Sequence, residues 1–449
     1  MADLQHITLT TKPTAQISYT FHPTTTPSST TPPPLLIFLN GLGLPQASWS
    51  ATIAKLQESN TPLPALLTYD RYGQGSTTDR DPADAGAEDA THGHDCLAVV
   101  RDLRQLVTQI ASEKLNVKLE DIDTIPLILV ANSIGCALAR LYAQTYPHTV
   151  AGLVLLDSVL ANSDFVSIFP DPDAGDFDAA SLPEGITADA IRTAREGIAR
   201  IFHPSVGSKE GLSRKNLASL LPDSDGPVLT GPDGKGPFVT VVGHDFDTFA
   251  TESAKMSGGR GEELTKAYVN PYWHRYNQGL VSITGEEGRG KGPVLAEGAG
   301  HFIQKDRPDL VAGEVLDVLK KVLVVPPPFP TPSNRIPSSS SVNDLNTTPF
   351  TLPPPPPSKL GIYPCLPLET LTPLEPLDPA PLNAPFPDPV YLRAPNDDPD
   401  PDPPIESPLS NGLHVAPADA IIPTALSTIL QKITGLFVSR LSEEEREGR

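Results

Sequence analysis

The chain has 449 residues and a net charge of −21, from 54 acidic and 33 basic side chains. This acidic balance argues against nucleic acid and anionic membrane surfaces as partners. The three cysteines (Cys96, Cys136 and Cys365) lack the spacing of a disulfide framework or a metal site, which fits a reducing compartment. With neither a secretory signal pattern at its beginning nor an apolar run long enough to cross a bilayer, the sequence predicts a soluble, cytoplasmic protein.

Proline divides the chain into unlike parts. Many of its 52 prolines follow Val325, in runs such as PPPFPTPSNRIPSSSS, which cannot bury enough apolar surface to offset the entropy of ordering. We therefore expect a globular domain over residues 1–325 and a disordered proline-rich linker over 326–417. Apolar residues at helical spacing predict an amphipathic helix within 418–449. This helix either docks on the domain or, like the linker, binds a protein partner.

Apolar runs and amphipathic patterns alternate along the globular part. Residues 4–10 and 16–22 alternate as two edge strands. Unbroken apolar runs, typical of strands buried on both faces, cover residues 35–39, 64–69, 126–131, 150–156, 238–242 and 293–297. Helical patterns fall between or after them, at 46–59, around 99–110, directly after Ser133, and at 308–322. This order predicts an α/β fold, a doubly wound and mostly parallel sheet covered by helices on both faces.

The regular alternation stops after residue 157. Between about 158 and 237, helical stretches at 188–202 and 215–221 stand among Pro, Gly and Asp clusters. We interpret this segment as a helical cap inserted into the sheet domain.

A serine stands where one predicted strand turns into a helix. Residues 131–135 read Ala-Asn-Ser-Ile-Gly, with Ser133 in the middle of the turn. A tight strand-to-helix turn exposes a serine hydroxyl, and the helix N-terminus directs backbone N–H groups toward negative charge formed there. The alternative is a buried strand followed by a serine that only caps the helix.

A serine needs a base, and the base needs an acid to orient it. His301 lies in a Gly-rich loop after the last predicted strand, at the sheet edge expected for Ser133, which makes it the candidate base. Three carboxylates follow strands. Asp245 is the preferred acid, Asp247 is its close competitor, and Asp157 is a third candidate whose simpler role is a turn or a helix cap.

An oxyanion hole requires two backbone N–H groups near the serine. Ile134, directly after Ser133, supplies one. Leu42, in the Asn-Gly-Leu-Gly loop of residues 40–43 after an early strand, is the natural second donor.

Neither a metal nor a cofactor is expected. The loop at residues 40–43 lacks the third glycine and the later acidic residue of a dinucleotide-binding fingerprint. His92, His94 and Asp95 stand close together, but no matching ligand set follows, so we interpret them as a polar start to a helix.

Four motifs in order resemble those of the α/β-hydrolase superfamily: residues 40–43 (NGLG), 70–76 (DRYGQGS), 131–135 (ANSIG) and 298–302 (GAGHF). The resemblance covers roughly residues 15–325. The first motif has Asn40 where the family usually has His, and the third has Ala131 where it usually has Gly. The resemblance implies the α/β-hydrolase fold. Members acting on haloalkanes or epoxides carry Asp at the position of Ser133, so Ser133 favours another chemistry.

These residues together predict a serine hydrolase of small or medium apolar acyl esters. Ser133 is the expected nucleophile, His301 the base, Asp245 the acid, and Leu42 and Ile134 the oxyanion donors. Two alternatives use the same residues differently. The domain is either a catalytically silent binding protein that uses its tail for interaction, or an acyltransferase whose acceptor is not water.

Overall fold

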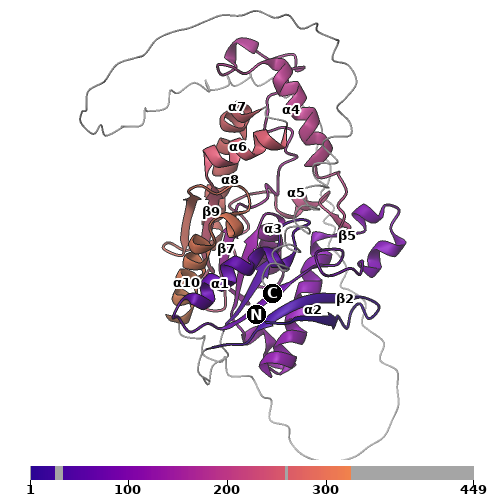
Figure 1. Ribbon diagram of the computed structural model, residues 1–449, viewed down its shortest axis with the longest axis vertical. Coiled ribbons are helices and arrows are strands. Elements are labelled where there is room, and N and C mark those ends of the chain that lie inside the picture. The colour runs from indigo at the N-terminus through magenta and orange to yellow at the C-terminus, as the bar shows by residue number, and fades with distance from the viewer. Residues whose placement is uncertain (1, 26–33, 258–260, 325–449) are drawn as a thin grey trace, which may run out of the picture. The chain divides into compact units, whose positions relative to one another are not determined.

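The computed structural model describes residues 2–25, 34–257 and 261–324 (Figure 1). The predicted linker, the predicted C-terminal helix and Cys365 lie outside the described residues. An eight-stranded sheet forms the centre, in the order β1-β2-β4-β3-β6-β7-β9-β10. Its strands are β1 (Leu4–Thr8), β2 (Gln16–His22), β3 (Leu35–Leu39), β4 (Ala65–Tyr69), β6 (Leu127–Asn132), β7 (Val150–Leu156), β9 (Phe238–His244) and β10 (Gly290–Ala296).

The sheet is parallel from β4 to β10 and antiparallel only at β1 and β2. This confirms the predicted doubly wound, mostly parallel α/β fold. One detail is wrong: β2 pairs with both β1 and β4, so of the two strands predicted as edge strands only β1 lies at an edge, and β10 forms the opposite edge. A separate pair joins β5 (His94–Asp95) to β8 (Leu212–Ser213).

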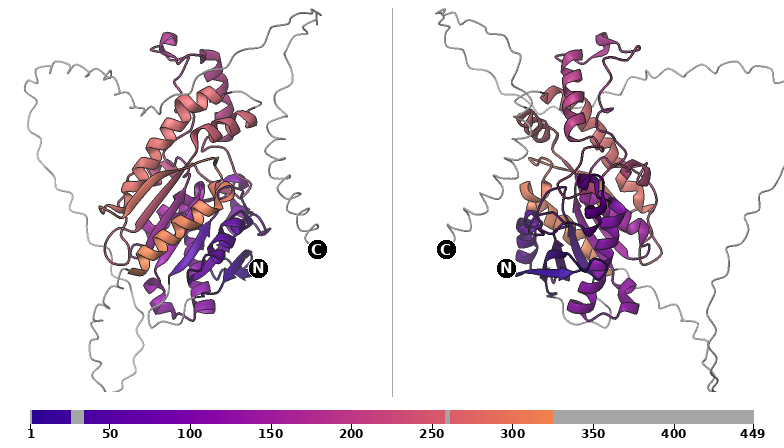
Figure 2. Two further views of the ribbon diagram at one scale, coloured as in Figure 1. Left: turned by 60° about the vertical axis from the view of Figure 1, so that its left-hand side comes forward. Right: turned by 90° about the vertical axis from the view of Figure 1, so that its right-hand side faces the viewer.

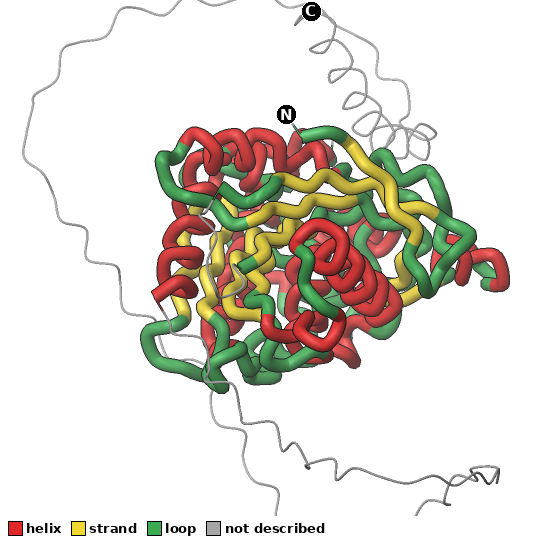
Figure 3. The backbone as a smooth tube through the Cα atoms, turned by 90° about the horizontal axis from the view of Figure 1, so that it is seen from below, coloured by secondary structure: helices red, strands yellow, loops and turns green. Residues whose placement is uncertain are grey.

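Helices cover both faces of the sheet. α1 (Ser50–Glu58), α9 (Ile303–Asp306) and α10 (Pro308–Val324) pack on one face, and α2 (Cys96–Leu115), α3 (Ile134–Thr145) and α8 (Asn270–Val281) on the other. Figure 2 shows α10, in orange, lying along its face, and Figure 3 shows helices on both sides of the strands.

The unbroken apolar run of β3 follows from this arrangement. Leu35, Ile37 and Leu39 belong to the core beneath α2 and α3, while Leu36 and Phe38 belong to the core beneath α1 and α10. Alternate side chains of a strand point to opposite faces, so a strand covered on both sides needs apolar residues at every position.

The segment between β7 and β9 contains α4 (Ala188–Ile201) and α5 (Leu217–Leu220), close to the two helical stretches expected there. No helix or strand was predicted from sequence for residues 243–292. These hold α6 (Phe246–Met256), α7 (Glu262–Leu264), the π-helical η6 (Thr265–Val269) and α8. In Figure 1, α4, α6 and α7 lie together above the sheet.

Short 3-10 helices occur in the connections. They are η1 (Gln46–Trp49), η2 (Pro82–Gly86), η3 (Ala90–His92), η4 (Leu119–Thr124), η5 (Ala179–Ser181) and η7 (Ser282–Thr284). Of the helices in the described ranges, none is both long and apolar enough to cross a membrane.

Candidate active site

Ser133 occupies a strained turn between β6 and α3. Its φ is 57° and its ψ is −123°, a conformation that L-residues seldom adopt and that costs energy unless the surroundings impose it. A Cβ on Gly135 would come within 2.4 Å of Leu39 O, so only glycine lets the start of α3 pass this close to β3. Strain in this turn, with a half-buried Ser133 side chain at its tip, is the geometry expected of an exposed nucleophile.

The backbone of Ser133 is bonded to the loop that follows β7. Its N–H donates to Leu156 O at 3.1 Å, and its carbonyl accepts from Val159 N at 3.1 Å. These two bonds lie on either side of Asp157, which has a positive φ of 42° and a fully buried side chain. The carboxylate of Asp157 is therefore held beside the turn that carries Ser133.

His301 bonds to this carboxylate. His301 Nδ1 lies 2.6 Å from Asp157 Oδ2. A carboxylate only accepts, so the proton is on Nδ1 and Nε2 is left as the basic nitrogen. Asn132, the residue before Ser133, donates from Nδ2 to His301 O at 3.0 Å, which ties the histidine loop to the turn. Within the described ranges Ser133 Oγ makes no hydrogen bond to His301, a contact that in enzymes often tightens only when substrate binds.

Asp245, the preferred acid of the sequence analysis, does not contact His301 in the described structure. Its carboxylate accepts from Thr248 N at 2.8 Å and caps the start of α6. Asp247 is exposed and pairs with Lys266 at 2.9 Å. The roles expected of Asp245 and Asp157 are thus exchanged: Asp245 caps a helix, and Asp157 meets the histidine.

Asp157 also forms a hydrogen bond with a second histidine. His244 Nδ1 lies 2.8 Å from Asp157 Oδ1, on the carboxylate oxygen that His301 does not use. Burial alone would raise the pKa of Asp157, but the charge and hydrogen bonds of His244 and the bond from His301 lower it to about 2. Asp157 is therefore ionised at neutral pH.

The loop expected to supply the second oxyanion donor lies against the turn. A Cβ on Gly41 would be 3.2 Å from Asn132 Oδ1 and 3.4 Å from the Cβ of Ser133. In the part of the chain that the structure describes, the N–H groups of Leu42 and Ile134 have no protein acceptor. The structure therefore brings this loop and the start of α3 together at Ser133.

A buried ion pair holds this loop in place. Glu210, from the segment between β7 and β9, accepts from Arg71 Nε at 2.9 Å and from Gly43 N at 2.5 Å. Arg71 in turn donates to Asn40 O at 2.8 Å and Gly41 O at 3.0 Å. Glu210 is 1% and Arg71 4% exposed. The segment predicted as a cap therefore reaches under the loop that carries Leu42.

The histidines near residue 92 serve the structure around α2. Asp95 caps α2 through Ala98 N at 2.8 Å, and His94 Nδ1 lies 2.8 Å from Asp84 Oδ1. Across residues 2–25, 34–257 and 261–324, no group of three or more His, Cys, Asp or Glu side chains could hold a metal ion.

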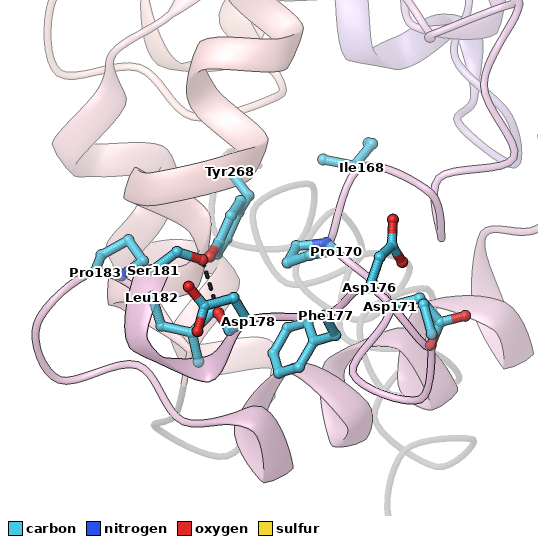
Figure 4. Close-up of a pocket in the computed structure, with 11 residues that line it drawn as sticks. Ile168, Pro170, Asp171, Asp176, Phe177, Asp178, Ser181, Leu182, Pro183 and Tyr268 are labelled. Carbon is cyan, nitrogen blue, oxygen red and sulfur yellow. Dashed lines mark hydrogen bonds between the residues drawn. The ribbon is translucent and has the colours of Figure 1, made fainter. Parts of the chain in front are cut away.

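A hollow of about 720 Å³ lies away from these residues, between residues 168–183 and η6 (Figure 4). Its lining includes Asp171, Asp176 and Asp178 but not Ser133 or His301. The lining mixes these carboxylates with apolar side chains such as Ile168, Phe177 and Leu182. The side chains beside His301 are different: Trp273 packs edge-on at 5.6 Å between ring centroids, and Phe165 packs on Trp273 at 6.3 Å.

Several residues of the site were not assigned a role from sequence. Asn132 lies in the motif of residues 131–135, and His244 follows the predicted strand of residues 238–242, but only their contacts reveal a function. Trp273 lies in α8, where Trp273, Tyr276 and Leu280 are buried at helical spacing. That spacing was the available signal for the helix.

The chain was compared with known protein families, curated sequences and solved structures. A search of curated protein sequences gives no match. Among solved structures, similar chains include a putative lipase from Acinetobacter baumannii AYE (18% identity, TM-score 0.40, covering 72% of this chain and 92% of the lipase). They also include a thermophilic esterase from Thermogutta terrifontis (18% identity, TM-score 0.41, covering 72% of this chain and 99% of the esterase). A third is an epoxide hydrolase mutant from Vigna radiata (12% identity, TM-score 0.42, covering 71% of this chain and 99% of the epoxide hydrolase). The sequence profile of the alpha/beta hydrolase family matches residues 36–315. The chain belongs to the alpha/beta hydrolase family.

Proposed function

We propose that this chain is a serine hydrolase that cleaves acyl esters, with Ser133 as nucleophile, His301 as base and Asp157 as acid. The observation that carries the proposal is the strained turn of Ser133, tied on one side to the loop of Asp157 and on the other to the loop of His301. Asp157 takes the place that the sequence analysis gave to Asp245.

The reaction follows the two-step course of such sites. His301 Nε2 takes the proton of Ser133 Oγ as the oxygen attacks the acyl carbonyl, and then gives it to the leaving alcohol. The N–H groups of Leu42 and Ile134 stabilise the negative oxygen of the tetrahedral intermediate. A water molecule, activated by His301 in the same way, then attacks the acyl-enzyme and releases the carboxylic acid product. Asp157 keeps the Nδ1 proton in place and stabilises the imidazolium.

An apolar substrate fits the surroundings of His301. Trp273 and Phe165 supply aromatic surface next to the base, and Phe202, which is 42% exposed, packs 6.1 Å from Phe165 between ring centroids. Two of these side chains come from the segment between β7 and β9. We therefore propose that this segment selects a small or medium apolar ester.

Labelling with a fluorophosphonate probe tests the nucleophile. We expect covalent labelling of the wild type, none of Ser133→Ala, and full labelling of Ser219→Ala, an exposed serine on α5. A panel of acyl esters then establishes turnover. A folded wild type that is neither labelled nor active would overturn the assignment and favour a silent binding protein. Product analysis with added alcohols separates hydrolysis from acyl transfer.

A further inference from the structure

The carboxylate of Asp157 holds two imidazoles, although the proposed reaction uses only one. His301 Nδ1 is 2.6 Å from Oδ2, and His244 Nδ1 is 2.8 Å from Oδ1. His244 ends β9 and is 2% exposed, so it is out of reach of substrate and solvent. Its place on the acid calls for a physical role.

The contacts of His244 determine how many protons it carries. Its Nε2 lies 3.2 Å from Asn270 Oδ1. The amide of Asn270 cannot be turned around, because its Nδ2 donates to Phe246 O at 2.9 Å and an oxygen there would face another oxygen. Both ring nitrogens of His244 therefore face acceptors. A neutral imidazole would direct a lone pair at one of them, so only the doubly protonated ring satisfies both contacts.

The surroundings of the ring suit a cation. Phe249 stacks on His244 at 4.0 Å between ring centroids, and Trp273 meets it edge-on at 5.6 Å. Aromatic faces attract cations, and the ionised Asp157 supplies the opposite charge. Burial on its own would lower the pKa of His244, but the charge and hydrogen bond of Asp157 raise it above the usual histidine value.

We propose that His244 is a permanently protonated positioning residue that neutralises Asp157 and so makes the site work at lower pH than a single-histidine triad would. The proposal rests on the proposed hydrolase function. In the transition state His301 becomes an imidazolium, and a lone carboxylate would stabilise that charge strongly. Asp157 paired with a cationic His244 stabilises this imidazolium less, and we therefore expect activity to extend further into the acid range.

Other charged groups near the two rings act more weakly. Asp245 follows His244 but points to the start of α6, and His274 on α8 lies against Phe246 rather than Asp157. Beside His301, Glu252 of α6 lies over Gly300, and Asp306 accepts from Gly300 N at 3.0 Å. Lys305 also lies near Glu252. None of these other groups has a hydrogen bond to the Asp157 carboxylate in the described structure, whereas His244 and His301 both do.

The protonation of His244 can be measured without any activity. Ring N–H signals of the ¹⁵N-labelled full chain would be recorded at about pH 8, where an ordinary histidine with a pKa of about 6.5 is neutral. Signals that vanish in His244→Gln belong to His244. We expect two N–H signals, one for each ring nitrogen. A single N–H signal beside an unprotonated nitrogen would overturn the proposal whether or not the chain is a hydrolase.

The pH dependence of kcat/KM tests the consequence for catalysis. In His244→Gln the charge of Asp157 is no longer balanced, so Asp157 stabilises an imidazolium at position 301 more strongly. We expect the acid limb of the profile to move upward by about one pH unit. Asn270→Leu removes the acceptor of Nε2 but leaves both rings on Asp157, and we expect a smaller shift in the same direction. This second variant keeps the test valid if His244→Gln does not fold.

His274→Gln is the matched control. It removes a neighbouring imidazole that makes no contact with Asp157, and we expect the acid limb to stay in place. An unchanged limb in both His244→Gln and Asn270→Leu, in enzymes that still turn over, would overturn the proposal while leaving the hydrolase function intact. A wild type that hydrolyses no ester but shows two His244 N–H signals would instead contradict only the proposed hydrolase function.

Discussion

Two neighbouring strands of the sheet are each followed directly by an aspartate, and the two carboxylates have opposite surroundings. Asp157, after β7, is fully buried, has a positive φ and bonds to two imidazoles. Asp245, after β9, is partly exposed and caps α6. Both follow the pattern of strand, aspartate and next segment. The difference shows that a strand-end carboxylate reaches a histidine only where burial and its hydrogen-bond partners direct it there.

The largest effect should separate these two carboxylates by activity. Asp157→Asn removes the negative charge and replaces one of the two carboxylate oxygens with an NH2 donor, so the proton on His301 Nδ1 is no longer fixed, and we expect kcat/KM for an activated ester to fall by about 10⁴-fold. Asp245→Asn is the matched variant, because asparagine caps helices as well as aspartate does. We expect it to retain nearly all activity. The reverse outcome would return the role of the acid to Asp245.

Much of the arrangement of this candidate site could be predicted from the sequence. The strands β3, β4, β6 and β7 were predictable because burial on both faces leaves unbroken apolar runs. Ser133 and His301 were predictable because each stands in a short motif whose neighbours must be small: a Cβ on Gly135 or Gly300 would strike backbone or a carboxylate.

The role that we propose for Asp157 was not predictable, for a physical reason. The contact of Asp157 with His301 joins residues 144 positions apart, and nothing local distinguishes it from Asp245. The helix-capping role judged simpler for Asp157 in fact belongs to Asp245. This was missed because α6, the helix that Asp245 caps, was not predicted. The role that we propose for His244 was equally unpredictable, since its protonation depends on Asn270 in another helix that was not predicted.

A third carboxylate, Glu210, tests whether burial alone accounts for the effects expected at Asp157. Glu210 is as inaccessible as Asp157 but pairs with Arg71 rather than with a base. Glu210→Gln would leave the Arg71 charge buried without its partner, and we expect the free energy of unfolding to fall by about 3–5 kcal/mol in urea titrations. Activity should fall by less than for Asp157→Asn, at most about 10²–10³-fold, the cost of one misplaced oxyanion donor.

The exposed pair of Lys55 and Glu58, 2.8 Å apart, is the control for Glu210. Its side chains are 47% and 63% exposed, so Glu58→Gln should change stability by less than about 1 kcal/mol. Equal small changes in both variants would show that the Arg71 pair does not hold the loop of residues 40–43.

The smallest effect tests the other half of the comparison, the structural role of Asp245. Its carboxylate accepts from Thr248 N, and the pKa of Asp245 is lowered chiefly by this backbone bond. Asp245→Ala leaves that N–H at the start of α6 without its cap, and we expect thermal unfolding to show a loss of about 1 kcal/mol. Asp245→Asn should keep most of that stability, because the cap depends on the acceptor oxygen and only in part on the charge. α6 begins directly after His244 and carries Phe249, so a frayed α6 would also loosen the packing on His244. A loss of activity in Asp245→Ala but not in Asp245→Asn would therefore mark Asp245 as a support of His244 and still not as the acid.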